Sequence, residues 1–280
     1  MTLGHHWKSS AQYQRVVEAN KKSYREFANI YDKTETCVVS KRLQMMLQKD
    51  LDAILARINK PGQQIHALDA CGGSGNVSLK LLNRNVNVTL CDISPELIEI
   101  FKEKCSKQGF TTYSAVCQEI GEYLSKTERR FDLIVFSSAL HHIEDYASIL
   151  QLSAKRLNPK GFIYTVFDHV EWKFPTFQII WIDWLLYAVA TYPKDLISSA
   201  AKKLTKKINR ESFSETELGN LTEYHVRHGI NDYSLVAFLR KIGLEVVVHQ
   251  RYFDARHKLF RILLYAIRRY TGFKLLLKAN

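Results

Sequence analysis

Hydrophobic residues gather along the chain in short runs that are typical of buried strands. Ile65–Leu68 leads into the glycine-rich turn Gly72–Gly75, and a helix is expected to open at about Asn76. Val86–Cys91 and Phe131–Ser137 follow as further apolar runs, and the second is almost continuously apolar. Runs of this length between turn residues predict strands of a parallel sheet that is covered on both faces.

Amphipathic segments separate these runs. The pattern predicts helices over Val77–Leu82, Glu96–Gln108 and Gln118–Leu124, and a further helix that ends near Leu157. Two more strands are expected at Thr112–Val116 and Phe162–Phe167, the second after a turn at Asn158–Gly161. Much later in the chain, a helix is expected at Tyr233–Ile242 and a strand at Leu244–His249. Strands that alternate with helices predict an α/β fold, a Rossmann-like doubly wound sheet.

The segments outside this alternating region are helical in pattern. Ser10–Tyr31 and Ser40–Ile58 carry apolar residues three and four apart, so we expect an N-terminal helical cap over residues 1–60. The aromatic side chains of Tyr24, Phe27 and Tyr31 have two interpretations: packing, or a cap that closes over a pocket and contacts the substrate.

Residues 171–230 are expected to form a helical insertion or substrate lid. Phe174–Tyr192 is rich in large apolar groups, and Trp181 and Trp184 share one helical face. The run is too short to span a bilayer and contains Asp183, so it either packs on the sheet or forms an apolar wall beside a substrate. We assign residues 61–170 to the core and 231–280 to the rest of the same single domain.

The tail carries an unusual share of the charge. The 280 residues have a formal net charge of +12, and residues 256–278 contain seven basic and no acidic side chains. Residues 255–270 are predicted to form an amphipathic helix with a basic stripe, and Phe273–Lys278 a last edge strand. The stripe is either a solvated face or a contact for a membrane surface or an anionic substrate. Without a nucleic-acid module, we expect no nucleic-acid partner.

Cysteine usage and the N-terminus indicate a compartment. Five cysteines, an odd number, form no C-x-x-C pair, which argues against a disulfide framework and gives no metal-ligand spacing. The N-terminus lacks a signal-peptide pattern. We therefore expect a cytoplasmic protein, or one peripheral to a membrane, without a metal site.

Asp69, at the end of the first strand, restricts what the glycine loop binds. A carboxylate there disfavours a pyrophosphate, because like charges repel at short range. A dinucleotide fingerprint would need glycine where the chain has Ser78, and there is no P-loop lysine motif. The loop suits a nucleoside with a cationic tail and no phosphates, a description that S-adenosylmethionine (SAM) fits.

Asp92 follows the second strand, seventeen residues after Gly75. In a βαβ unit this position lies beside the first loop, where a carboxylate accepts the hydroxyls of a ribose. The alternative is a helix N-cap, but Ser94 and Pro95 already supply a cap and first turn. We therefore favour the ribose role.

Several motifs in order resemble the class I SAM-dependent methyltransferases. They are Leu68-Asp69 with the loop, Asp92-Ile93-Ser94-Pro95, Phe131–Ile134, Leu140-His141-His142 and Leu157–Gly161. The resemblance covers residues 65–167 and implies a seven-stranded sheet with the last strand antiparallel. It also implies cofactor-binding residues, with S-adenosylhomocysteine as the product: Asp69, Cys71 (in place of the first loop glycine), Gly72, Gly73, Gly75, Asp92, Ile93 against the adenine, Gln118 and Ser137.

The acceptor of the methyl group is less defined. His141 and His142 follow the fourth core strand and are either structural or, chiefly for His142, a substrate contact or general base. Further base candidates are Asp168, His169, Tyr224, His225 and His228, and we expect substrate contacts from Tyr24, Tyr31, Trp181, Trp184 and His225. The sequence favours methylation of a small, apolar or lipid-like acceptor. A non-catalytic binding protein and an RNA methyltransferase stay open as alternatives.

Overall fold

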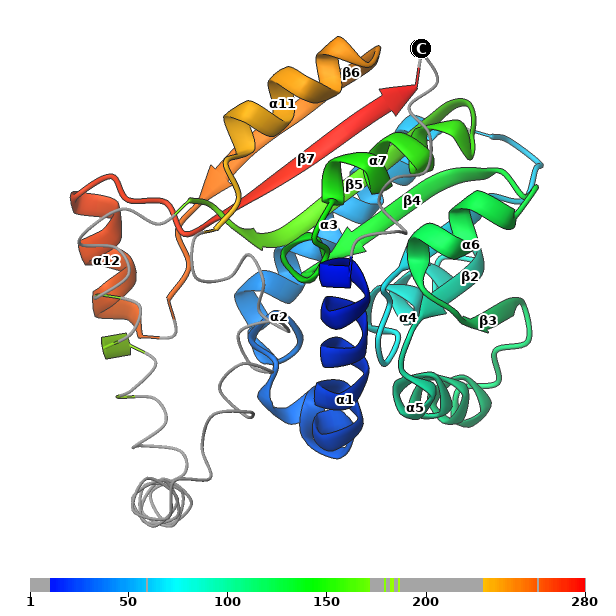
Figure 1. Ribbon diagram of the computed structural model, residues 1–280, viewed down its shortest axis with the longest axis horizontal. Coiled ribbons are helices and arrows are strands. Elements are labelled where there is room, and N and C mark those ends of the chain that lie inside the picture. Colours follow the sequence, from blue (N-terminus) through cyan, green and yellow to red (C-terminus); the bar gives the residue numbers. More distant parts are fainter. Residues whose placement is uncertain are drawn as a thin grey trace.

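The computed structural model describes residues 11–58, 60–171, 179, 182, 183, 186, 229–255 and 257–279. Seven strands form one sheet in the order β3-β2-β1-β4-β5-β7-β6 (Figure 1). The strands are β1 His66–Ala70, β2 Asn87–Asp92, β3 Tyr113–Cys117, β4 Phe131–Ser137, β5 Leu157–His169, β6 Leu244–Tyr252 and β7 Gly272–Ala279. β1 to β5 are parallel and β7 is antiparallel to both neighbours, so the predicted α/β fold is confirmed.

Helices cover both faces of the sheet. The described helices are α1 Ala11–Thr34, α2 Thr36–Val39, α3 Lys41–Ile58, α4 Asn76–Leu82, α5 Pro95–Lys107, α6 Ile120–Lys126, α7 Tyr146–Lys155, α11 Asp232–Lys241 and α12 Lys258–Ala266, with a 3₁₀ turn, η2, at Leu140–His142. One apolar cluster joins α6, α7 and α11 to the sheet, and a second joins α3, α4 and α5 to its other face. Burial of these two layers of apolar side chains is the main stabilising contribution to the core.

Two predictions about the tail are wrong. Residues 273–278 do not form an edge strand, because β7 lies between β5 and β6 and its apolar run Leu275–Leu277 is buried. The predicted helix over residues 255–270 is only Lys258–Ala266, since the chain turns at Arg268, whose φ is +52°. The face of α12 opposite the protein is apolar rather than basic, as shown by the exposure of Leu259, Ile262 and Tyr265.

Strand boundaries differ in one further place. The expected turn at Asn158–Gly161 is part of β5, which begins at Leu157 and pairs there with Phe131 of β4. Near its other end, a register shift between Val166 and Asp168 accompanies a φ of +68° at Phe167. The shift places the carboxylate of Asp168 in the interior below η2.

Most of the expected insertion, residues 171–230, lies outside the described residues. Among the described helices, none is long and apolar enough to cross a membrane.

A largely buried ion pair joins α3 to β7, the last strand but one of the sheet. Lys274 Nζ of β7 lies 2.7 Å from both carboxylate oxygens of Asp50, and the hydroxyl of Tyr164 donates to Asp50 Oδ2 at 2.6 Å. Asp50→Ala should lower the free energy of unfolding by about 3 kcal/mol, because the Lys274 ammonium would stay buried without its carboxylate. Urea unfolding measures the change. Asp52→Ala, which removes a mostly exposed carboxylate two residues away, should change stability by less than about 1 kcal/mol; equal losses in both variants would contradict the prediction.

Candidate functional site

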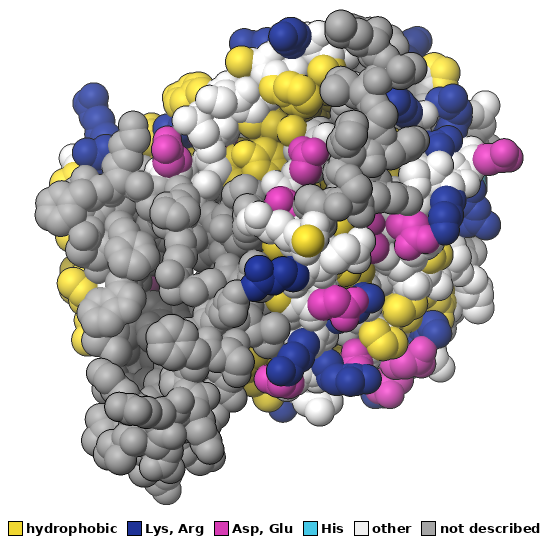
Figure 2. All heavy atoms as spheres, in the orientation of Figure 1, with side chains coloured by type: hydrophobic (Ala, Val, Ile, Leu, Met, Phe, Trp, Pro, Cys, Tyr) yellow, Lys and Arg dark blue, Asp and Glu magenta, His cyan; other side chains and the backbone are white. Residues whose placement is uncertain are grey.

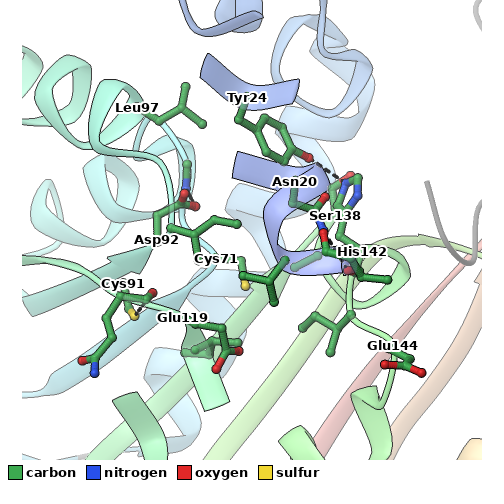
Figure 3. Close-up of a pocket in the computed structure, with 18 of the residues that line it drawn as sticks. Asn20, Tyr24, Cys71, Cys91, Asp92, Leu97, Glu119, Ser138, His142 and Glu144 are labelled. Atoms are coloured by element: carbon green, nitrogen blue, oxygen red, sulfur yellow. Dashed lines mark hydrogen bonds between the residues drawn. The ribbon is translucent and has the colours of Figure 1, made fainter. Parts of the chain in front are cut away.

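A pocket lies at the carboxyl ends of β1, β2 and β4, beneath α1 (Figure 3). Its empty space, including the open mouth, is about 710 Å³. In an open parallel sheet this edge is where ligands bind. The lining residues come from five parts of the chain: Tyr13, Val16, Val17, Asn20, Tyr24 and Tyr31 of α1; Cys71 and Gly73 of the glycine loop; Cys91, Asp92, Ile93 and Leu97 from β2 to α5; Gln118, Glu119 and Ile120 after β3; and Ser138, Ala139, His142, Ile143 and Glu144 after β4.

The glycine loop makes a tight turn between β1 and α4. Gly73 and Gly75 have φ values of +54° and +84°, and a Cβ on Gly75 would lie 2.2 Å from the ring of Phe101. Cys71 also has a positive φ, +57°, although a side chain disfavours this region by about 1–2 kcal/mol. The loop therefore keeps the left-handed geometry that a glycine would adopt at position 71, and it exposes Cys71 and Gly73 to the pocket.

Asp69 lies beneath the loop and is almost completely buried. Its Oδ2 accepts hydrogen bonds from the backbone N–H and the hydroxyl of Ser78, at 2.9 and 2.7 Å. Its Oδ1 is buried without a hydrogen-bond partner. Burial raises the pKa of Asp69 to about 6, against smaller opposing effects of the Ser78 bonds. Because a buried acceptor without a partner is costly, Asp69 Oδ1 is suited to a donor from a ligand.

Asp92 ends β2 and lines the pocket, whereas Asp69 lies behind the glycine loop and does not line it. Asp92 Oδ2 accepts from the backbone N–H of Gly73 at 2.8 Å, and Asp92 Oδ1 from that of Ser94 at 2.9 Å. Burial raises its pKa. The hydroxyl of Ser94 caps α5 by accepting from Leu97 N at 3.2 Å, so Asp92 is not the N-cap. Each oxygen of Asp92 keeps lone-pair capacity for a ligand hydroxyl.

The arrangement fits SAM by several observations. The unpartnered Oδ1 of Asp69 suits a cationic amino group, and the carboxylate of Asp92 lies at the end of the adjacent strand. The turn passes so close to Asp69 that a Cβ on Gly72 would come within 2.8 Å of Asp69 Cγ, so only a glycine fits there. Ile93, Leu97 and Gln118 line the pocket beyond Asp92 as an apolar and amide surface suited to an adenine. The exposed Cys117 does not line it. No group of three or more metal-ligating side chains occurs in the described part of the chain.

The two adjacent histidines differ in their surroundings. His141 is buried; its Nδ1 lies 2.8 Å from Asp168 Oδ1, and its backbone N–H donates to the same oxygen at 3.2 Å. Burial raises the pKa of Asp168 to about 8. His142 lines the pocket, and its Nε2 lies 2.8 Å from the hydroxyl of Tyr24 (Figure 3). The two imidazole rings are 4.0 Å apart between centroids. His141 thus sits between Asp168 and the pocket-facing His142.

Helix α1 closes the pocket opposite the glycine loop. Asn20 Nδ2 donates to the carbonyl of His142 at 3.2 Å, whereas Asn20 Oδ1 is buried without a partner. The hydroxyl of Ser74 in the loop donates to Asp32 Oδ1 at 2.5 Å near the end of α1. Polar contacts at both ends of the pocket therefore hold α1 over it.

Several predicted site residues are placed differently by the structure. Ser138, with φ +56°, lines the pocket, whereas Ser137 pairs within the sheet. Gly72 and Gly75 shape the glycine loop but do not line the pocket. Tyr24 and Tyr31 line it as expected. His169 lies near His141, with ring centroids 6.0 Å apart. Trp181, Trp184, Tyr224, His225 and His228 lie outside the described residues.

The pocket residues that sequence reasoning missed include the polar side chains of Tyr13, Asn20, Glu119, Ser138 and Glu144. Asn20 stands one helical turn before Tyr24, so the i, i+4 spacing on a predicted cap helix was a usable signal. Ser138 and Glu119 gave no signal in the sequence, because whether their side chains point into the pocket depends on how β4 ends and how α6 begins.

Comparisons with known proteins match the part of the chain that carries this pocket. A family model described as a methyltransferase domain matches residues 67–161, which include Asp69, Asp92 and His142. The tRNA 5-carboxymethoxyuridine methyltransferase of Escherichia coli (strain K12) is 31% identical over 143 residues, 50% of this chain and 51% of the relative. A ubiquinone biosynthesis O-methyltransferase of Xylella fastidiosa (strain M23) is 30% identical over 114 residues, 41% of this chain and 45% of the relative. The chain spans about half the length of the curated relatives it matches.

Among solved structures, the magnesium protoporphyrin IX methyltransferase from Synechocystis PCC 6803 with bound SAH has a TM-score of 0.55 at 13% identity. The match covers 96% of this chain and 100% of that one. The fold is a Rossmann-like doubly wound sheet with a pocket at its carboxyl edge. Residues 67–161 match a methyltransferase domain, in agreement with the resemblance that the motifs indicated.

Proposed function

We propose that the protein transfers a methyl group from SAM to a small, apolar or lipid-like acceptor. The observation that carries the proposal is the single pocket that joins the glycine loop and Asp92 at one end to the His142–Tyr24 pair at the other. A methyl donor at the first end and an acceptor at the second would meet inside one cavity under α1.

The cofactor end is assigned from its donors and acceptors. The loop and Asp69 hold the methionine part, Asp92 accepts the ribose hydroxyls, and Ile93, Leu97 and Gln118 contact the adenine. When bound, SAM supplies an electrophilic methyl group and is converted to S-adenosylhomocysteine. The remaining task of the protein is alignment, since an in-line displacement depends on holding the acceptor atom against that methyl group.

The acceptor end combines a base with apolar walls. Val16, Val17 and Ile143 line the pocket around His142. For an acceptor that carries a proton on oxygen or nitrogen, the proton passes to His142 Nε2 as the acceptor lone pair forms its bond to the methyl carbon. In the ligand-free protein the hydroxyl of Tyr24 lies 2.8 Å from this nitrogen and orients the ring; the acceptor takes the place of this hydroxyl at Nε2 before the proton passes. His141 and Asp168 support the ring from below and do not touch the acceptor.

An RNA acceptor is the second candidate. It is favoured by the tRNA-modifying relative at 31% identity and by the net charge of +12. The apolar lining of the pocket favours the first candidate. RNA binding would weaken steeply with salt, because phosphate contacts release counterions.

Two measurements test the proposal. Isothermal titration with SAM and with S-adenosylhomocysteine should show binding at one site, and methyl-labelled SAM should label a total lipid extract but not a tRNA pool. Absence of binding would overturn the cofactor assignment. Label confined to tRNA would overturn the acceptor class, and binding without label in either fraction or in a small-metabolite extract would favour a non-catalytic role.

Binding of SAM should depend on pH through Asp69. Its pKa of about 6 in the ligand-free protein means that the carboxylate form, which the cationic cofactor requires, is depleted below pH 6. We expect the dissociation constant to be flat above about pH 7 and to rise up to about tenfold per pH unit below 6. Titration calorimetry at pH 5 to 8 measures this, and Asp69→Asn should flatten the profile. An unchanged profile in that variant would assign the dependence to another group.

The raised pKa of Asp69 also affects the stability of the ligand-free protein, which changes with pH in the opposite direction to SAM binding. A folded-state pKa above the unfolded value of 3.8 means that the folded protein binds more protons between about pH 4 and 6. The contribution of Asp69 to the stability of the ligand-free protein therefore falls as pH rises through this window.

A further inference from the structure

The outer face of α12 is an exposed apolar surface. Leu259, Tyr265 and Ile262 are 78%, 70% and 54% exposed, and Leu263 is also exposed. At about 100° per residue these four side chains share one side of the helix, and Leu264, which is fully buried, lies on the opposite side. Large apolar side chains that cluster on one exposed helix face mark an interaction site more often than isolated ones do.

Basic side chains border this face. Lys258 begins α12, and the exposed Arg268 and the half-buried Arg269 follow its last turn. Arg261 is half-buried, and its guanidinium donates to the carbonyl of Ala255. The stretch from residue 255 to 279 contains no acidic residue. Lys274 and Lys278 of β7 do not add to this surface, because they pair with Asp50 of α3 and Glu245 of β6.

The surface lies at the same edge of the sheet as the pocket. β6 and β5 run in the same direction, since both are antiparallel to β7, and Tyr252, Gly272 and His169 lie in register at their ends. α12 connects β6 to β7 at that edge (Figure 1). In Figure 2, hydrophobic side chains emerge along the left margin of the molecule, where Figure 1 places α12.

A second described segment adjoins the first turn of α12. Asp183 is buried, and its Oδ1 accepts from the backbone N–H of His257 at 2.9 Å and lies 2.7 Å from His257 Nδ1. Ile182 and Leu186, on either side of Asp183 in sequence, are exposed. Asp183 thus contacts the residue that precedes α12, and two further exposed apolar side chains stand close to Asp183 in the sequence.

We propose that this face of α12 docks on the surface of a lipid bilayer that contains anionic lipids. A helix with an apolar outer face and basic residues at its borders inserts the apolar side chains at the headgroup boundary while the cations meet anionic headgroups. An RNA would use the cations but leave the four apolar side chains unburied. A second copy of the chain would bring two sets of like charges together.

Docking in this orientation turns the carboxyl edge of the sheet toward the membrane. An acceptor dissolved in the bilayer would then reach the pocket from the side on which α12 lies. Vesicle binding is measured without SAM or an acceptor. The docking proposal can therefore fail while the proposed methyl transfer stands, and the proposed methyl transfer can fail while vesicle binding is observed.

Co-sedimentation with vesicles tests the inference. The unmodified chain should bind vesicles of phosphatidylcholine with about 30% phosphatidylglycerol at least about tenfold more tightly than vesicles of phosphatidylcholine alone, and salt should reduce this preference. Leu259→Glu with Ile262→Glu should reduce binding at least about tenfold. Met45→Glu, at an exposed apolar position on α3, is the matched control and should bind as the unmodified chain does.

A second variant separates the charge from the apolar face. Arg268→Gln with Arg269→Gln should remove most of the preference for anionic vesicles and leave weak binding to both kinds. Circular dichroism and thermal melting confirm that each variant is folded. No vesicle binding by the unmodified chain, equal binding by the Leu259→Glu, Ile262→Glu variant, salt-sensitive RNA binding in place of vesicle binding, or a dimer that this variant splits would each overturn the proposal.

Discussion

Asp92→Ala is expected to weaken SAM binding by about 100-fold or more. The carboxylate lies at the end of β2 and faces the pocket, and it is the acceptor we assign to the ribose hydroxyls. Two hydrogen bonds to a charged group contribute about 1.5–3 kcal/mol each, and the alanine variant would lose both. Titration calorimetry with SAM measures the loss directly, without knowledge of the acceptor.

Controls must separate this loss from damage to the loop, because Asp92 also accepts from the backbone of Gly73 and Ser94. Asp92→Asn keeps one oxygen acceptor and should lose less affinity than the alanine variant. Glu99→Ala removes an exposed carboxylate from the next helix, α5, and should bind as the unmodified chain does. Unchanged affinity in Asp92→Ala, with a normal melting temperature, would remove Asp92 from the site.

His142→Ala is expected to lower kcat by about 100- to 10,000-fold with little change in SAM affinity. This range is typical of a lost general base, and His142 lies at the end of the pocket away from the ribose-binding carboxylate. Tyr24→Phe should cost less, about fivefold, since it removes one hydrogen bond that orients the ring. Single-turnover assays with the acceptor in excess measure the chemical step.

The matched control is His66→Gln, because His66 begins β1 at the opposite edge of the sheet. A variant with unchanged kcat would assign His142 a purely structural role. A rise in KM for SAM equal to the fall in kcat would instead place His142 against the cofactor.

The core of the fold was predictable because its strands are buried on both faces. Runs such as Phe131–Ser137 need no knowledge of their neighbours to be identified as parallel strands. The position of β7 in the sheet was not predictable, because an apolar run does not show between which strands it inserts. The exposed face of α12 was also missed: helical periodicity separates two faces but does not tell which one meets the protein.

At the site, the two aspartates at the strand ends were predictable, and Asn20 of α1 was not. Asp69 and Asp92 follow strands directly, so topology alone places them at one edge. Asn20 shares a helix face with Tyr24, but it enters the pocket only because α1 crosses that edge, a long-range contact that the spacing alone does not give. The difference between Ser137 and Ser138 depends on the left-handed φ of Ser138, which turns one side chain inward at the end of β4.

The strand order has a consequence for how the chain reaches this fold. β6 meets the rest of the sheet only through β7, which the ribosome makes after it. β7 pairs in turn with β5, about one hundred residues earlier in the chain. Because closing so long a loop is slow, β6 should stay unpaired while β1 to β5 assemble. During biosynthesis this interval leaves a strand edge and the apolar face of α12 open to chaperones and to aggregation.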